Sequence, residues 1–205
     1  ALALAAPLGL AVAPAAAQAA RSHGDASAEA FVQSEASKGI AILNDHSLSL
    51  AAKKAAFYGF VNQTADVPRI TGFVLGRYRR QVSPAQYRQF AEVFRQYADS
   101  VYESRLGDYH GERLQVTGSL VHAPGDVVVS SVVTGGDFKG EPVVNWRVLQ
   151  GPQGWKIVDV QAQGVWLAVV EQQDFTSTLA NANGNIDVLI RQLRTQAAGG
   201  SARRN

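Results

Sequence analysis

Apolar residues recur every three or four positions through the first half of the chain, which is the spacing of helices. Helical spacing begins at Phe31, and a second helix is expected over 49–63. A short third helix is expected to open at Asp66, an N-cap residue followed by Pro68 in the first turn. The pattern therefore predicts a helical region over 29–107.

The helix that opens at Ser83 and Pro84 has the strongest pattern. Serine is typical of an N-cap residue and proline of the first helical position. Spacings of three and four residues then place a wide aromatic stripe on one face of this helix, made of Tyr87, Phe90, Phe94, Tyr97 and Val101. Most such stripes belong to the core, but this one is wide enough to line a pocket as well.

From Tyr109 the hydrophobic period changes to two, which indicates strands. Four strands with short connections are expected over 109–164, and helices again over 165–196. This order predicts an α+β fold in which the helices are segregated to one face of a four-stranded, curved antiparallel sheet. No repeat or linker divides 20–196, so one domain is expected. The segment 197–205, rich in Gly, Ala and Arg, is expected to be a disordered tail.

Composition narrows the classes of function. The absence of cysteine excludes disulfides, iron–sulfur clusters and cysteine nucleophiles. Nineteen basic against 17 acidic residues give a net charge of +2, too small an excess for a dedicated nucleic-acid-binding protein. The sequence contains no phosphate-loop, dinucleotide or hydrolase signature, and its four histidines have no metal-ligand spacing. No cofactor or metal is therefore expected.

The first 20 residues carry no charge and combine a short apolar stretch with small residues at its end. This composition is typical of the second half of a signal peptide, with cleavage after Ala17 or Ala19. Segment 1–19 is therefore expected to direct export and to be removed. A retained membrane anchor is the alternative, but so many alanines with two prolines make a poor bilayer span.

Two polar features could carry chemistry. Asp159 lies in the middle of the fourth expected strand and could act as a general base, although a structural carboxylate is more common there. Arginines gather near the end of the third helix, where Arg77, Arg79 and Arg80 follow Arg69 within twelve residues. Guanidinium groups suit phosphate, so a head-group or docking role is one interpretation. A solvated face, offset by nearby acidic residues, is the other.

Several ordered motifs together carry a resemblance to a known family. Phe73-Val74-Leu75-Gly76-Arg77-Tyr78 comes first, and Tyr102-Glu103-Ser104-Arg105-Leu106 ends the aromatic helix. Gly154-Trp155-Lys156-Ile157-Val158-Asp159-Val160 and the terminal Asp187-Val188-Leu189-Ile190-Arg191-Gln192-Leu193 follow. From about Phe31 to Arg194 the chain resembles the MlaC family of periplasmic phospholipid-binding proteins, the auxiliary proteins of ABC transporters. A hopanoid-associated branch of this family is equally compatible.

The resemblance implies a sheet related to that of nuclear transport factor 2, a helical subdomain, and an apolar cavity between them for a lipid. It implies a periplasmic carrier of a phospholipid or hopanoid-type lipid. The implied partners are an inner-membrane ABC transporter with an MCE-type subunit and an outer-membrane lipoprotein complex. Trp166 departs from the family pattern, which usually has serine two residues after the glycine that corresponds to Gly164.

The stripe and the resemblance together predict the residues of the site. Lipid contacts are expected from Phe60, Phe73, Val74, Phe90, Phe94, Tyr97, Val116, Val144, Trp146 and Trp166. We expect Phe90, Phe94 and Tyr97 to face Val144 or Trp146 across the cavity. Two alternatives stay open: a small enzyme on the same type of sheet, with an acid–base pair at Asp159 or His110, and a transporter adaptor with a filled interior.

Overall fold

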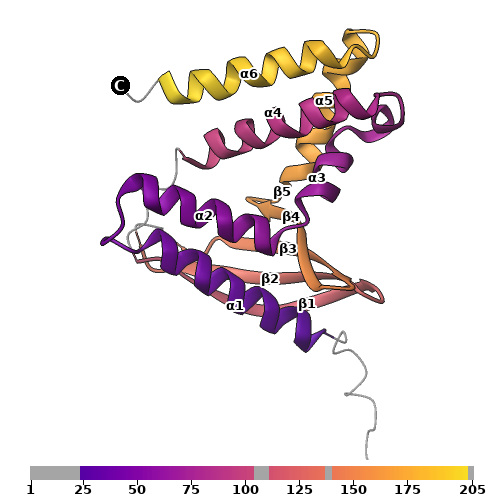
Figure 1. Cartoon of the computed structure of the whole chain (residues 1–205). Coiled ribbons are helices and arrows are strands. Elements are labelled where there is room, and N and C mark those ends of the chain that lie inside the picture. Colours follow the sequence, from indigo (N-terminus) through magenta and orange to yellow (C-terminus); the bar gives the residue numbers. More distant parts are fainter. Residues whose placement is uncertain (1–23, 104–110, 137–139, 203–205) are drawn as a thin grey trace, which may run out of the picture.

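The computed structural model describes residues 24–103, 111–136 and 140–202. The expected signal segment 1–19 and His110 lie outside these residues. The helices are α1 (Ala26–Leu43), α2 (Leu50–Thr64), α3 (Val67–Val74), the 3₁₀ helix η1 (Gly76–Arg80), α4 (Pro84–Glu103), α5 (Leu167–Asn181) and α6 (Ile186–Ala202). The strands are β1 (Arg113–Ala123), β2 (Asp126–Thr134), β3 (Val143–Gly151), β4 (Gly154–Ala162) and β5 (Val165–Trp166) (Figure 1).

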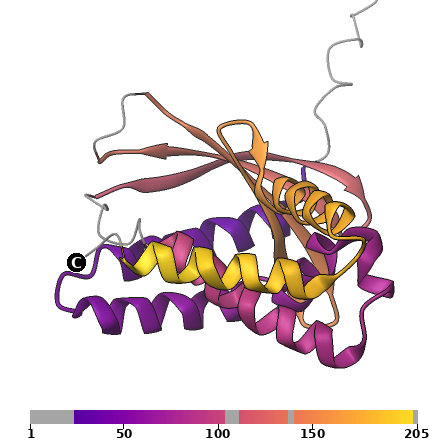
Figure 2. The same cartoon turned by 90° about the horizontal axis from the view of Figure 1, so that it is seen from above.

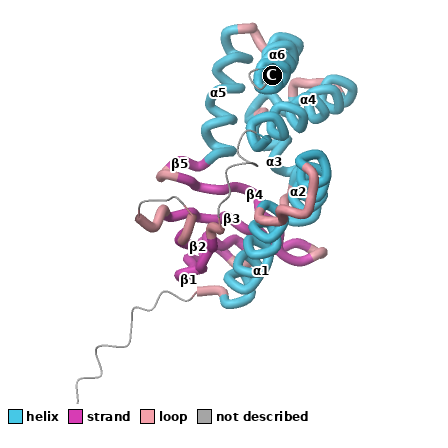
Figure 3. The backbone as a smooth tube through the Cα atoms, turned by 90° about the vertical axis from the view of Figure 1, so that its left-hand side faces the viewer, coloured by secondary structure: helices cyan, strands magenta, loops and turns pink. Residues whose placement is uncertain are grey.

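The elements form two lobes. In one lobe, α1 and α2 lie on the same side of the sheet (Figures 2 and 3). In the other lobe, α4 and α6 lie one above the other beyond α2, and α5 runs across them down to β5, with α3 between the lobes (Figure 1). Each lobe has its own apolar core. One cluster is made by residues of α3, η1, α4, α5 and α6, and the other lies between α1 and the central strands. Hydrophobic burial therefore stabilises each lobe separately.

The sheet runs in the order β1-β2-β3-β4-β5, and every neighbouring pair is antiparallel. The predicted α+β class is confirmed. The prediction of four strands is corrected to five, because the chain reverses at Gln163 (φ 52°) and Gly164 (φ 79°) and pairs again with β4. Val165 and Trp166 form this added strand, so α5 begins at Leu167.

Capping residues define where the helices begin. The expected N-cap at Asp66 is confirmed by the backbone N–H of Arg69, which donates to its side chain over 3.1 Å. The expected cap at Ser83 is also confirmed, because its hydroxyl accepts from the N–H of Gln86 over 3.2 Å. The expected start of the first helix is wrong. Asp25 caps the N–H groups of Ser27 and Ala28, which moves the start of α1 to Ala26.

The expected disordered tail over 197–205 is corrected up to Ala202, where α6 ends. The last three residues of that expected tail lie outside the described part of the chain. The reason for the longer helix is packing. Ile186, Leu189, Ile190 and Leu193 are buried in the core that α6 shares with α4. A helix anchored so firmly over its first turns can continue into a sequence rich in alanine, which is the best helix former. Among the described residues, no helix is both long and apolar enough to cross a membrane.

Strand β4 is the point where the two lobes join. The N–H of Asp66, which opens α3, donates to the carbonyl of Ile157 over 2.9 Å. Two residues later on β4, the carboxylate of Asp159 accepts from the N–H of Ala168 at the start of α5, also over 2.9 Å. The chain therefore enters the helical lobe at two places, at the starts of α3 and α5. Hydrogen bonds to β4 fix both of these starts.

Candidate functional site

Phe90 and Phe94 of the aromatic stripe belong to the core of the helical lobe. Their rings stack at a centroid distance of 5.7 Å, and Phe175 of α5 meets both edge-on at 6.1 and 5.8 Å. Val74 is fully buried in the same cluster. Our expectation that Phe90 and Phe94 face Val144 or Trp146 is wrong, because their closest packing partners lie within the helical lobe.

Trp146 and Val116 belong to the core of the sheet lobe instead. Trp146 packs among the valines beneath α1, and its indole N–H donates to the hydroxyl of Ser131 over 2.9 Å. Val116 is partly buried against the same cluster. The structure therefore separates these two residues from the aromatic stripe with which the sequence grouped them.

The two predicted residues Phe60 and Phe73 differ in their surroundings. Phe60 of α2 packs on α1 at Gly39, where an added Cβ would come within 3.0 Å of its ring. Phe73 of α3 is 41% exposed, on the side of the helix away from the buried Thr71 and Val74. Phe60 thus holds two helices together, whereas Phe73 faces outward.

Tyr97 and Glu171 meet where the helical core ends. The Tyr97 hydroxyl on α4 donates to the Glu171 carboxylate on α5 over 3.0 Å, and both side chains are half-buried. Burial raises the pKa of Glu171, the hydrogen bond from Tyr97 opposes that rise, and the charge of Asp174 adds to it. This polar pair lies next to the core, because the ring of Tyr97 still contacts Phe175.

Apolar side chains continue beyond this pair and are partly exposed. Val101 lies one turn further along α4 from Tyr97, and Leu167 lies one turn back along α5 from Glu171. The two helices diverge here, with α5 running down to β5 (Figure 1). Val101 is 48% exposed and Leu167 is 39% exposed.

The inner face of the sheet supplies a second apolar surface near the same place. The register pairs Trp146 with Val160, Val144 with Ala162, and Ala162 with Val165. Paired residues share a face of a sheet, so these side chains lie on the side that α1 covers further along. The predicted residue Val144 thus joins Leu167 and Val101 as a candidate, whereas the sequence alone missed the latter two. For Val101, continuation of the stripe by one turn was the available signal.

Trp166 occupies the N-cap position of α5, and its side chain makes no capping hydrogen bond. Asp159 performs this task instead, accepting from the N–H groups of Ala168 and Val160. Burial raises the pKa of Asp159, and the two backbone hydrogen bonds oppose the rise. The carboxylate considered as a general base therefore has a structural role. By register Trp166 pairs with Gln161, which places it on the other face of the sheet from Val144.

The three arginines after α3 are exposed, as expected for a docking or head-group role and equally for a solvated face. They lie on η1, whose Tyr78 is buried in the helical core. The guanidinium of Arg77 lies 5.1 Å from the centre of the Tyr78 ring. That of Arg79 lies 3.7 Å from the centre of the Tyr87 ring.

Two of the hollows among the described residues are well defined. One, of about 790 Å³, lies between the end of α1 and the start of β1, and its lining includes Ile40, Asn44 and Leu114. The other, of about 400 Å³, lies among α2, α4 and α6, beside Tyr58, Asp99 and Arg194. None of the predicted lipid-contact residues lines either hollow. Within residues 24–103, 111–136 and 140–202, no group of acidic residues and histidines has metal-binding geometry.

We expect Glu171→Gln to stabilise the protein at neutral pH. Because the folded-state pKa lies above the ordinary value of 4.5, the folded protein retains a proton that the unfolded chain loses as the pH rises. The free energy of unfolding therefore falls across that interval, and the loss persists above it. Glutamine keeps an acceptor for Tyr97 but carries no charge.

Urea unfolding of both proteins between pH 4 and pH 8 measures this effect. The variant should be the more stable protein at pH 7 and should show the flatter pH dependence. An unchanged pH dependence, or lower stability at pH 7, would show that Glu171 is better solvated than its position indicates.

Comparison with known proteins identifies a family and similar solved structures. A family model described as MlaC protein matches residues 33–195. Among solved structures, the fold is similar to that of a phospholipid-binding protein from Ralstonia solanacearum, determined in complex with a phospholipid. The TM-score is 0.77 at 24% sequence identity, and the alignment covers 86% of this chain and 99% of that one. At this identity the similarity establishes a common fold.

Proposed function

The chain belongs to the MlaC family, and we propose that it binds a phospholipid between its two lobes and carries it between membranes. The family consists of lipid-binding carriers and not of enzymes. The structural role of Asp159 agrees with this, because the most suitable candidate for a general base serves as a helix cap.

One observation supports the proposed position of the lipid above all others. Large apolar side chains are exposed on the adjoining edges of the two lobes, at Val101, Val165 and Leu167. Two acyl chains contain about 30 methylene groups, and shielding each from water contributes about 0.8 kcal/mol. An apolar surface shared by two lobes meets this requirement better than polar contacts do. Val144 and Val160, on the inner face of the sheet, would contact the same chains.

The polar pair of Tyr97 and Glu171 lies where we expect the apolar site to end. The Tyr97–Glu171 pair lies between the apolar core of the helical lobe and the proposed acyl site. Glu171 carries the charge least compatible with a phosphate, so the head group should lie away from it, toward solvent. We therefore expect weak discrimination among phospholipid head groups.

Membership of the MlaC family also supports a proposal about where in the cell the protein works. We propose that it works in the periplasm, with an inner-membrane ABC transporter that has an MCE-type subunit and with an outer-membrane lipoprotein complex. A hopanoid-type lipid is the alternative cargo. Its rigid, fused rings would need the same apolar surface but no phosphate contact.

Lipid extraction tests the proposal directly. Protein purified without detergent should release about one diacyl lipid per chain into organic solvent, identified by mass spectrometry. Hopanoids in place of phospholipids would retain the carrier role and change the cargo. A protein that releases no lipid, and that takes none from phospholipid vesicles, would instead be an adaptor with a filled interior.

A further inference from the structure

The arginines of η1 lack a carboxylate partner among the described residues. Arg69, one helix earlier, forms an ion pair with Asp66 over 3.0 Å. In the described part of the chain, no such pair involves Arg77, Arg79 or Arg80, although all three are exposed within a single turn. Three positive charges thus lie together on this turn without local neutralisation, which favours an anionic partner.

Two of these guanidinium groups are held in place by tyrosine rings. Arg79 stacks on Tyr87 at 3.7 Å, and Arg77 lies over Tyr78 and donates to its hydroxyl over 3.3 Å. Tyr78 is only 6% exposed, so it anchors the turn in the helical core. Stacking restricts each guanidinium before a ligand arrives, so less conformational entropy is lost on binding.

An exposed aromatic residue lies beside these charges. Phe73 is on the same side of α3 as Arg69, four residues earlier, and is 41% exposed. The neighbouring Gly72 lies against the Arg79 stack, because a Cβ there would be 3.8 Å from the Tyr87 hydroxyl and 4.0 Å from Arg79 Nε. Phe73 therefore directly follows a position that lies against the Arg79 stack, and it is exposed as the three arginines are. We call these four residues the Arg–Phe face, made of Phe73, Arg77, Arg79 and Arg80.

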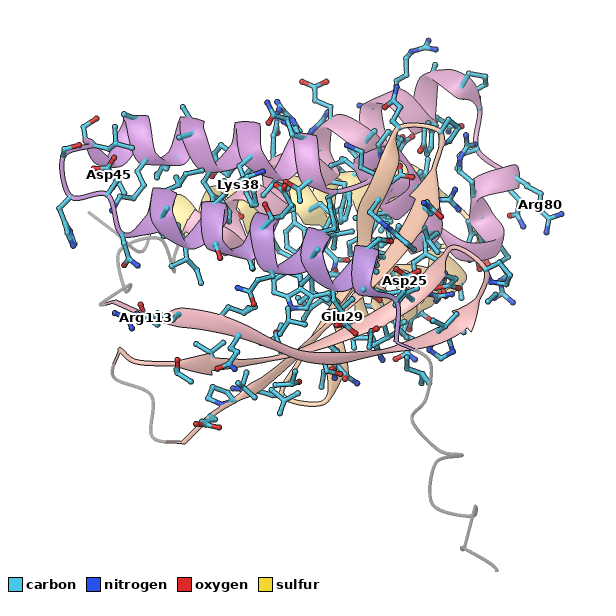
Figure 4. All side chains as sticks on the ribbon, turned by 90° about the horizontal axis from the view of Figure 1, so that it is seen from below. Asp25, Glu29, Lys38, Asp45, Arg80 and Arg113 are labelled. Atoms are coloured by element: carbon cyan, nitrogen blue, oxygen red, sulfur yellow. The ribbon has the colours of Figure 1, made fainter. Side chains whose placement is uncertain are left out.

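We infer that the Arg–Phe face docks the protein onto the surface of an anionic phospholipid bilayer. Guanidinium groups match the geometry of lipid phosphates, and an exposed ring beside them can enter the boundary between head groups and acyl chains. The face also projects: Arg80 extends from the end of the molecule opposite Asp45 (Figure 4). A projecting end with charges and an aromatic ring fits a flat membrane better than it fits a concave acidic protein.

This inference adds to the proposed function, and the two can fail separately. The proposed function concerns the lipid held between the lobes, whereas docking concerns a different surface. A variant of the Arg–Phe face should therefore keep its bound lipid while losing its attachment to vesicles.

Vesicle co-sedimentation at low salt tests the inference. The protein should bind vesicles that contain phosphatidylglycerol and should not bind vesicles of phosphatidylcholine alone. The variant Arg77→Gln/Arg79→Gln/Arg80→Gln should lose about 100-fold in partitioning to the anionic vesicles, because each basic residue near such a surface contributes roughly fivefold. Phe73→Ser, which leaves the charge unchanged, should also weaken partitioning.

The matched control is Arg95→Gln/Arg191→Gln/Arg194→Gln, which removes the same charge from exposed positions on α4 and α6. It should retain most of the binding, and both triple variants should melt at similar temperatures and keep their extracted lipid. Equal losses for the two triple variants would mean that net charge alone drives attachment and would overturn the docking face. So would an absence of binding by the wild type, or a polyglutamate competitor that binds the Arg–Phe face more tightly than the vesicles do.

Discussion

Phe175→Ala should lower the free energy of unfolding by about 3–5 kcal/mol, the cost of removing a buried aromatic ring from a core that cannot collapse around the space. Phe175 is 3% exposed and contacts the rings of Phe90, Phe94 and Tyr97. Its loss leaves a cavity at the centre of the helical lobe and removes three aromatic contacts at once. Urea unfolding at 25 °C, followed by circular dichroism, measures the difference.

Phe73→Ala is the matched control, because it removes the same side chain from a surface that is 41% exposed. Its effect on stability should stay below about 1 kcal/mol. Similar costs for the two variants would show that the helical lobe is loosely packed. A small cost for Phe175→Ala would return Phe90 and Phe94 to the candidate lipid site, since a lining that is already partly empty loses little when a ring is removed.

Leu167→Asp should abolish most of the lipid binding with little change in stability. In the proposed complex, the new carboxylate would lie against acyl chains, and a buried polar group without a partner costs several kcal/mol. We therefore expect lipid affinity to fall more than 100-fold. In the free protein, residue 167 is the first of α5, where the positive end of the helix dipole favours a negative charge and offsets the repulsion from Asp159.

Leu120→Asp provides the comparison. Leu120 is 52% exposed on β1, and its partner in the register is Val128, on the face of the sheet away from α1. Lipid per protein after extraction, together with uptake of a fluorescent phospholipid from vesicles, should separate the two variants. If Leu167→Asp retains the lipid content of the wild type, the acyl chains do not lie at this edge of the lobes. Equal losses in both variants would point to a general effect of added charge.

The elements of the fold followed from local sequence chemistry. Alternation every second residue identified the strands, and spacings of three and four residues identified the helices. Asp66 and Ser83 marked two helix starts, because capping depends on residues within one turn. The errors occurred where a distant contact decided the outcome. The end of α6 depends on packing against α4, and β5 depends on pairing with β4 after a reversal at Gly164.

The sequence by itself determined the fold class, the family and a wide aromatic stripe on α4, since each is carried by spacing and motif. It did not determine which stripe residues are core, because Phe90 and Phe175 are brought together by the crossing of two helices that are far apart in the chain. Only the tertiary structure divided the apolar residues into two cores and left Val101 and Leu167 partly exposed. Exposure of this kind depends on where two helices diverge, and no local pattern along either helix records that divergence.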